Sequence, residues 1–269
     1  MKRNYNTVII GQHCLLVPYR PEHVERYHTW MQDPDLLQAT GSEPLSLQEE
    51  YEMQASWRSD DAKCTFIVLA RNLLDEKSKA ELTSGSGDLL RDDFIRRTLC
   101  AMVGDVNLFL SEEEEEEQDD DHPPPTTPGG SQEACKAFAS SKPHPQAELD
   151  VMVAEKSCRG KGVGREACCL MMLYGATHLS IRRFYCKINQ DNEASLGLFR
   201  NKLNFRQCGY ASCFQQFELE LKGETPSRMI EMLLLLLGSE SELNTRQLTA
   251  SISKAHEKTE ATHTNENER

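Results

Sequence analysis

The spacing of apolar positions divides residues 8–221 into strands and helices. Alternating apolar and polar positions, or short apolar runs, predict strands at residues 8–10, 14–17, 65–70, 104–110, 148–153, 184–188, 205–211 and 214–221. Helical spacing or capping signals predict helices at residues 22–31, 46–54 and 192–202, and a further helix carrying Ala167, Leu170, Met171 and Tyr174. The order predicts an α+β domain with three layers, a mixed central β-sheet and helices on both faces.

Three stretches lack this patterning. Residues 72–99 mix charged and small residues with scattered leucines, which is unlike a core. Residues 111–146 hold an acidic run, a proline triplet and paired glycines, and we expect a disordered insertion there. Residues 238–269 are polar. The expected organisation is one domain over residues 1–221, interrupted by that insertion, followed by a short apolar segment and a polar tail over residues 222–269.

Charge and composition exclude several classes of function. The net charge is −13, and the acidic run from Glu112 to Glu117 with Asp119, Asp120 and Asp121 supplies nine of these charges. No basic surface stands out, so we expect no nucleic-acid partner. The longest apolar stretch, residues 229–237, is far shorter than the ~20 residues of a spanning helix, so we expect no membrane partner. The N-terminus has no signal-peptide core, which predicts a cytoplasmic protein, with a nuclear one as the alternative.

The ten cysteines form no CxxC pair and show no metal spacing with histidine. We therefore expect reduced, mostly buried thiols and no metal site. An acyl-cysteine mechanism is a weak alternative, because Cys168 and Cys169 lie within a predicted helix and Cys158 beside a glycine-rich loop.

That glycine-rich loop carries the strongest chemical signal in the chain. Gly160, Gly162 and Gly164 lie between a predicted strand and a predicted helix, together with the cations Arg159 and Lys161. Glycines here let successive backbone N–H groups converge at a helix N-terminus, where the helix dipole favours an anion. The pattern indicates a pyrophosphate site. The plainer alternative is a flexible surface turn.

A dinucleotide fingerprint is a second alternative, since residues 162–167 formally match GxGxxA. That fingerprint follows its strand directly within a repeated parallel fold. Here about eight residues separate strand and glycines, and only one strand–helix–strand crossover is predicted. A Walker P-loop is excluded, because Gly162 rather than Ser or Thr follows Lys161.

Two carboxylates, Glu148 and Asp150, share one face of the strand before the loop with Met152, because side chains alternate along a strand. A carboxylate pair next to a binding site suits general-base chemistry. The alternative is a pair of solvated residues in salt bridges. The opposite face, with Leu149, Val151 and Val153, is apolar and should pack on helices.

Arg159-x-x-Gly162-x-Gly164, then Asn192-x-x-Ser195-x-x-Leu198-Phe199 and a final Phe205, resemble the acetyl-CoA-binding core of the GNAT acetyltransferases. Residues 13–19, 27–31, 42–45, 63–68, 102–110 and 214–215 resemble a branch of that family linked to acetylation of α- and β-tubulin. The resemblance covers most of residues 1–221. Asn204 replaces the usual Gly before Phe205, and Asn tolerates the left-handed backbone needed there.

The resemblance implies how acetyl-CoA is held. The pantetheine arm would lie on the backbone of Val151, Met152 and Val153, between strands 148–153 and 184–188. The pyrophosphate would lie on the N–H groups of the loop residues, namely Arg159, Gly160, Lys161, Gly162, Val163 and Gly164. Asn192 and Ser195 would face the far arm of the cofactor. The plainer interpretation is that they cap their helix, and the two roles are compatible.

The resemblance also implies the chemistry. Glu148 is the first candidate for general base and Asp150 the second. Many family members have a Tyr acid where this chain has Phe199, so the acid stays unassigned. The expected activity is acetyl transfer from acetyl-CoA to a protein N-terminal α-amine, with tubulin or microtubules as the implied partner. The alternatives are a non-catalytic CoA-binding interaction protein and a small-molecule amine acetyltransferase.

Overall fold

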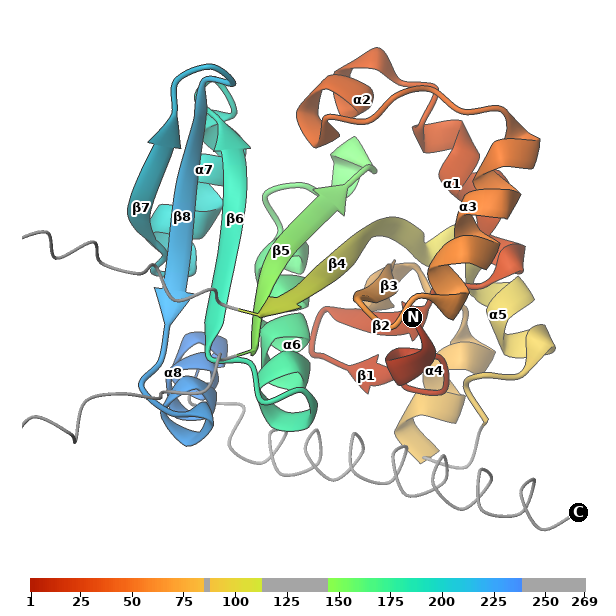
Figure 1. The fold of residues 1–269 in the computed structure, drawn as a ribbon. Coiled ribbons are helices and arrows are strands. Elements are labelled where there is room, and N and C mark those ends of the chain that lie inside the picture. Colours follow the sequence, from red (N-terminus) through yellow and green to blue (C-terminus); the bar gives the residue numbers. More distant parts are fainter. Residues whose placement is uncertain (85–87, 113–144, 239–269) are drawn as a thin grey trace, which may run out of the picture.

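The computed structural model describes residues 1–84, 88–112 and 145–238. The described residues form one eight-stranded sheet (Figure 1) in the order β1-β2-β3-β4-β5-β6-β8-β7. Only β5 and β6 pair in parallel; every other pair of neighbouring strands in this sheet is antiparallel. The strands are β1 (Ile9–Ile10), β2 (Cys14–Pro18), β3 (Lys63–Ala70), β4 (Met102–Glu112), β5 (Pro145–Val153), β6 (Arg183–Asn189), β7 (Arg206–Ala211) and β8 (Gln216–Lys222).

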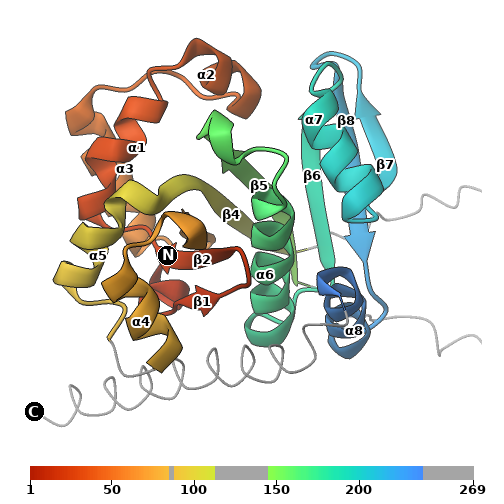
Figure 2. The same cartoon turned by 180° about the vertical axis from the view of Figure 1, so that it is seen from behind.

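Helices cover both faces of the sheet (Figures 1 and 2). They are α1 (Val24–Trp30), α2 (Pro34–Thr40), α3 (Leu47–Ser59), α4 (Glu76–Ser84), α5 (Asp92–Thr98), α6 (Val163–His178), α7 (Glu193–Leu196) and α8 (Pro226–Leu237). One buried cluster joins α6, η6 (Gly197–Lys202) and α8 to one face, through residues such as Leu108 and Leu149. A second cluster joins α1 and α5 to the other face, through Ile67 and Met152. The expected α+β fold with three layers is therefore present.

Local sequence signals explain several element boundaries. Ser46 caps α3 by the expected capping box: its hydroxyl accepts from Glu49 N–H at 3.3 Å, and its own N–H donates to the Glu49 carboxylate at 2.8 Å. The predicted helix at residues 192–202 divides into α7 and the π-helix η6 (Gly197–Lys202). Asn204 takes the left-handed backbone expected of it, with φ of +59°.

Residues 72–99 differ from the expectation. They contain α4 and α5, and the side chains of Phe94 and Ile95 are buried. Arg97 of α5 donates to both oxygens of Glu81 in α4 at 3.0 Å, which joins the two helices. A few well-placed apolar residues suffice here, because the small polar residues Ser78 and Thr98 are buried with them and most other positions of both helices are exposed or half-buried.

The sheet also extends into the region expected to be disordered. Ser111 pairs with Gln146 and Glu112 with Pro145, so two residues at each end of 111–146 are strand rather than insertion. Residues 113–144, like the tail residues 239–269, lie outside the described residues.

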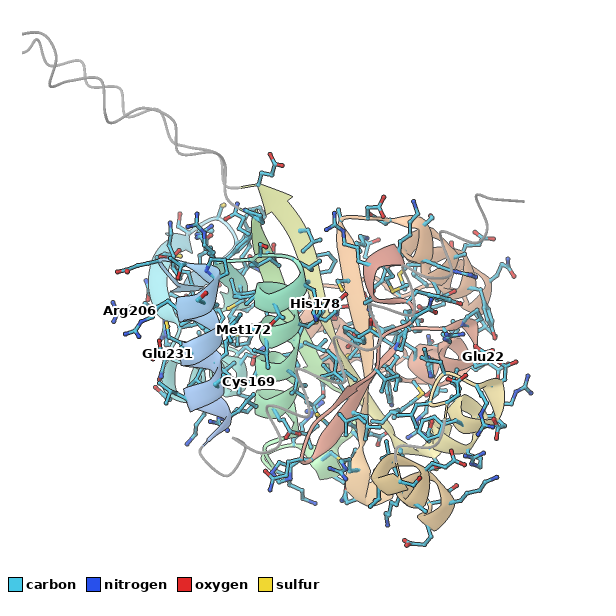
Figure 3. The ribbon with its side chains drawn as sticks, turned by 90° about the horizontal axis from the view of Figure 1, so that it is seen from below. Glu22, Cys169, Met172, His178, Arg206 and Glu231 are labelled. Carbon is cyan, nitrogen blue, oxygen red and sulfur yellow. The ribbon has the colours of Figure 1, made fainter. Side chains whose placement is uncertain are left out.

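The apolar segment 229–237 belongs to α8, which lies beside α6 (Figure 3). Met229 and Leu233 are fully buried in the same cluster as the residues of α6. Arg165 of α6 donates to the Leu236 carbonyl of α8. This helix therefore packs on the domain instead of extending from it. None of the helices in the described ranges is long and apolar enough to cross a membrane.

Candidate active site

The two parallel strands at the centre of the sheet separate partway along their length. Their pairing covers Gln146 with Arg183, Ala147 with Phe184 and Glu148 with Tyr185, and then stops. Beyond Glu148, β5 continues to Val153 along β4 alone, while β6 continues along β8. Figure 1 shows the two strands diverging from this point. Beyond Glu148, the β6-facing edge of β5 thus has no strand partner among the described residues. This is the edge expected to hold pantetheine.

β4 fixes β5 from its other side. At Gly104 an added Cβ would lie 1.8 Å from the Met152 carbonyl oxygen, so the approach of the two strands requires glycine there. As expected, Leu149 is buried in the cluster with α6, and Val151 and Val153 pack against that cluster. Met152 belongs to the cluster on the opposite face. Glu148 and Asp150 therefore lie on the face that α1 also covers.

The glycine-rich loop lies just past the end of β5. Gly160 and Gly162 have φ of +70° and +85°, a backbone conformation that L side chains rarely adopt, and Gly162 is the N-cap of α6. No side chain caps this helix start, and the first bond of the helix runs from Glu166 N–H to the Gly162 carbonyl at 2.9 Å. The N–H groups of the preceding helical residues, Val163 and Gly164 among them, lack intrahelical acceptors and are open to an anion.

The side chains of the two loop cations, Arg159 and Lys161, have different surroundings. The Arg159 side chain folds back onto β5, with Nε donating to the Val153 carbonyl at 2.7 Å and a second nitrogen donating to the Ala154 carbonyl at 3.3 Å. Lys161 is exposed. Arg159 therefore holds the loop against the strand, and Lys161 is the cation at the loop surface. A ligand that used the Val153 carbonyl would compete with Arg159.

The start of α6 is anchored by a buried carboxylate. Glu166 accepts three backbone N–H bonds from the turn between β1 and β2, from Gln12 at 2.6 Å, His13 at 2.8 Å and Cys14 at 2.8 Å. Gly11 in that turn approaches so closely that an added Cβ would lie 2.8 Å from the Glu166 carboxyl carbon. The position of the helix N-terminus is therefore set by the far end of the sheet.

Glu148, the first candidate for general base, has a cationic partner. Lys187 of β6 lies 3.3 Å from its carboxylate. This pair spans β5 and β6 next to the last paired position, Glu148 with Tyr185. The charge of Glu148 also raises the pKa of Lys187, against the lowering effect of burial. Glu148 thus occupies the salt-bridged position that the alternative interpretation described, and the sequence did not reveal Lys187 as its partner.

Asp150, the second candidate, has no such cation among its described contacts. One carboxylate oxygen accepts from the Val151 N–H at 3.0 Å. The side chain keeps solvent contact, but surrounding protein atoms raise the pKa of its carboxyl, and the nearby charge of Glu148 raises it further. A solvent-accessible carboxyl with a raised pKa is a better proton acceptor than a salt-bridged one. The surroundings of Asp150 therefore suit a general base better than those of Glu148 do.

A third carboxyl, absent from the sequence expectations, lies on the same face. Asp105 of β4 is 2% exposed and accepts from the Asn107 side-chain amide at 2.8 Å. Tyr27 of α1 places its hydroxyl 3.5 Å from the same carboxylate oxygen. Burial raises the pKa of Asp105 to about 7, and the charge of Asp150 adds to that rise.

The remaining predicted residues lie near helix α7. Asn192 caps this helix by accepting from the Ser195 N–H at 3.1 Å, which is the capping role given above as the alternative. Phe199 is buried and packs edge-on against Phe205, with ring centroids 5.0 Å apart. Its ring belongs to the core.

Three buried thiols, two of them in α6, do not suit catalysis. Burial raises the pKa of Cys168 and Cys169, and Cys186 behaves likewise. A buried thiol with a raised pKa is a poor nucleophile. Within the described residues there is no group of three His, Cys, Asp or Glu side chains that could hold a metal ion.

The diverging central parallel strands and the glycine loop at a helix N-terminus form the arrangement that the resemblance to the GNAT acetyltransferases implies, and comparison with known proteins identifies the family. The model described as "Acetyltransferase (GNAT) domain" matches residues 13–205. The chain belongs to the GNAT acetyltransferase family, and it is an acetyltransferase.

Similar proteins include the human "Alpha/beta-tubulin-N-acetyltransferase 9", 40% identical over 222 residues, which cover 82% of this chain and 86% of that protein. The Drosophila melanogaster protein of the same name is 39% identical, over 82% of this chain and 88% of that protein. An "N-acetyltransferase 9-like protein" of Caenorhabditis briggsae is 40% identical, over 83% of this chain and 90% of that protein.

Solved structures share the fold. Spermidine N-acetyltransferase from Vibrio cholerae, in complex with CoA and spermine, has a TM-score of 0.53 and 14% identity, covering 82% of this chain and 99% of that chain. A GNAT acetyltransferase from Bacillus anthracis has a TM-score of 0.51 and 11% identity, covering 80% and 98%. At such identities the likeness concerns the fold alone.

Proposed function

We propose that this acetyltransferase moves an acetyl group from acetyl-CoA to the N-terminal α-amine of a protein, and that the protein is tubulin. The observation that carries the proposal is the unpaired edge of β5, which ends at the uncapped, glycine-lined start of α6 and carries Asp150. An extended donor with a pyrophosphate fits such a site. Relatives at about 40% identity named as α/β-tubulin N-acetyltransferases support the acceptor.

The loop residues fit a pyrophosphate. Around Gly160 and Gly162 an added Cβ would meet nothing within 4 Å, so the loop surface is open at these two residues. Lys161 adds a positive charge at the loop surface. Bound acetyl-CoA would supply the thioester acetyl group at the β5 end of the site.

Asp150 takes the role of base in this proposal. An α-amine has a pKa of ~8 and a lysine amine of ~10.4, so far more of the α-amine is neutral at pH 7. A carboxylate with a moderately raised pKa suffices to remove the remaining proton, directly or through water. This favours an α-amine over a lysine as acceptor. A tubulin acceptor places the reaction in the cytoplasm.

The test is transfer of isotope-labelled acetyl from acetyl-CoA to purified tubulin, to N-terminal and lysine peptides and to a polyamine. Wild type, Asp150→Asn and Glu148→Gln are compared, and mass spectrometry locates the label. We expect label on an α-amine, with kcat reduced about 100-fold in Asp150→Asn and much less in Glu148→Gln. The control is Glu76→Gln, which neutralises an acid whose side chain is 90% exposed.

Each other outcome contradicts a defined part of the proposal. Label on lysine or on the polyamine would contradict the α-amine acceptor. A greater loss in Glu148→Gln than in Asp150→Asn would return the role of base to Glu148. If acetyl-CoA raised the melting temperature but no acceptor were labelled, the non-catalytic CoA-binding interpretation would replace this one.

A further inference from the structure

A buried carboxyl lies behind the proposed base and needs an explanation. Asp105 is 2% exposed in the middle of β4. One oxygen, Oδ2, accepts from Asn107 and faces the Tyr27 hydroxyl, whereas Oδ1 is buried and has no hydrogen-bond partner among the described residues. Burying a carboxyl with half of its acceptors unmet destabilises a fold. An apolar residue would avoid that cost, so packing alone does not call for a carboxyl at this position.

The sheet register brings this carboxyl next to the proposed base. Asn107 of β4 lies directly opposite Asp150 of β5, and Asp105 lies opposite Met152. Asp105 and Asp150 are therefore diagonal neighbours on one face, a relation in which Cα atoms lie ~7–8 Å apart. Asn107, which holds Asp105, is the residue that faces Asp150 across the ladder.

Within the described residues, none of the side chains that shift the pKa of Asp105 is a cation. Tyr27 of α1 and Asp150 of β5 act on its charge, and Asp105 in turn raises the pKa of Tyr19, which follows β2. Glu50 of α3 acts on Tyr19 and on Tyr27. The carboxyl is therefore surrounded by acids and phenols.

Two histidines lie beyond this group. His28 of α1 lies 3.8 Å from the Glu50 carboxylate. His23 stacks on Tyr19 with ring centroids 6.4 Å apart, and burial lowers its pKa to about 3, so this ring is neutral at neutral pH. Neither histidine reaches Asp105 with an ion pair.

We propose that Asp105 is a positioning residue of the acetyl transfer, a second carboxyl held by Asn107 and Tyr27 behind Asp150, and that its charge tunes Asp150 as a base. This inference rests on the proposed function. Asp105 does not touch the acceptor amine, because its side chain is buried. It acts through the field that it exerts on Asp150.

The direction of the effect follows from the order of ionisation. Asp105 has a pKa of about 7, so it is neutral below that pH and negatively charged above it. A second negative charge opposes the charge on Asp150 and makes Asp150 hold a proton more strongly. As the pH rises through about 7, the base of wild type therefore becomes stronger. In Asp105→Asn this change cannot occur.

The test compares the pH dependence of kcat/KM in wild type and in Asp105→Asn with one acceptor peptide. The ratio of wild type to variant cancels the titration of the acceptor amine, which both enzymes share. We expect the ratio to rise roughly three- to tenfold between about pH 5.5 and about pH 8.5, centred on about pH 7. In Tyr27→Phe the same rise should occur at a higher pH than in wild type, because the Tyr27 hydroxyl lowers the pKa of Asp105.

Tyr174→Phe is the matched control. It removes a buried phenol that donates to the Arg3 carbonyl at 3.0 Å on the other face of the sheet, so its ratio to wild type should be independent of pH. A ratio for Asp105→Asn that is equally independent of pH, in an active and folded enzyme, would overturn the inference. If Asp105→Asn does not fold, the ratio of wild type to Tyr27→Phe decides, and a flat ratio overturns the inference.

Failure of the underlying function would look different. Wild type itself would then transfer no acetyl group at any pH, and no ratio could be formed. A wild type that is active on the acceptor peptide but shows flat ratios in both variants leaves the acetyltransferase intact and removes Asp105 from it.

Discussion

At the scale of single residues, the loop before α6 shows what glycine contributes to the site. Gly162 has φ of +85°, and an added Cβ would meet nothing within 4 Å. The choice of residue at position 162 is therefore restricted by the left-handed backbone and not by steric crowding. The open space around it is where we expect the pyrophosphate, so a side chain here would disturb the ligand more than the fold.

Gly162→Asp should weaken acetyl-CoA binding by about 100-fold or more, ~2.7 kcal/mol, because a carboxylate would replace open space among the anion-binding N–H groups. The fold should lose only about 1 kcal/mol, from the left-handed backbone. Titration calorimetry measures the binding and thermal denaturation measures the stability.

Gly41→Asp is the matched control for that experiment. Gly41 ends α2 with φ of +61° and also has nothing within 4 Å of an added Cβ, so it carries the same backbone strain away from the loop. It should lose similar stability and bind acetyl-CoA normally. Equal binding in both variants would show that the loop does not hold the pyrophosphate.

The sequence predicts this loop because its residues are neighbours in the chain, whereas Asp105 was not found. Asp105 and Asn107 lie on one face of β4, opposite Val106 and Leu108. Their relation to Asp150 depends on the register between β4 and β5, across residues 113–144. No local pattern encodes that register. The ion pair of Glu148 with Lys187 was missed for the same reason.

At the scale of elements, α8 shows how the short apolar segment that follows residue 221 joins the domain. Its Leu233 is fully buried against the α6 cluster, whereas Leu235, two residues on, is 77% exposed. One face of the helix thus packs on the domain and another faces outward. The same residue type on both faces of one helix allows a direct comparison.

Leu233→Ala should lower the free energy of unfolding by about 2–5 kcal/mol, because it leaves a cavity between α8 and α6. Leu235→Ala should change it by no more than about 0.5 kcal/mol. Urea denaturation of both variants measures the difference. Equal values would mean that α8 does not pack on α6 in solution.

Strong local signals predicted elements well, and weak ones did not. The strands β1, β2, β7 and β8, which pair as two hairpins, and the capped start of α3 all follow from patterns of neighbouring residues. The helices α4 and α5 were missed because only a few of their residues, such as Phe94 and Ile95, are buried. Their stability depends on tertiary contacts such as the Arg97–Glu81 pair.

At the scale of the whole molecule, the two residues that flank positions 113–144, Glu112 and Pro145, lie side by side in the sheet. Glu112 and Pro145 are register partners, so a two-residue turn can join them. Replacing residues 113–144 by Asn-Gly should therefore leave the melting temperature within a few degrees of wild type. Transfer to a peptide acceptor should stay within about twofold, since Asp150 and the glycine loop lie at the other end of β5.

Thermal denaturation and the peptide assay check this deletion. A folded deletion variant that loses peptide transfer would assign the acidic segment a part in catalysis. Loss of transfer to tubulin, with peptide transfer retained, would instead assign the acidic segment to recognition of the acceptor protein. The deletion thus separates the catalytic unit from the segment that makes the chain so acidic.

The bond between Glu166 and the β1–β2 turn has a consequence for how the protein is made. The three N–H groups it satisfies lie 152 to 154 residues earlier in the chain. A ribosome adding ~5–20 residues per second needs about 8–30 seconds to cover that distance. During this time the first hairpin is without the acceptor that anchors it. The turn is therefore completed only when α6 begins to form, so the anion-binding end of that helix and the first strands of the sheet mature in the same late step.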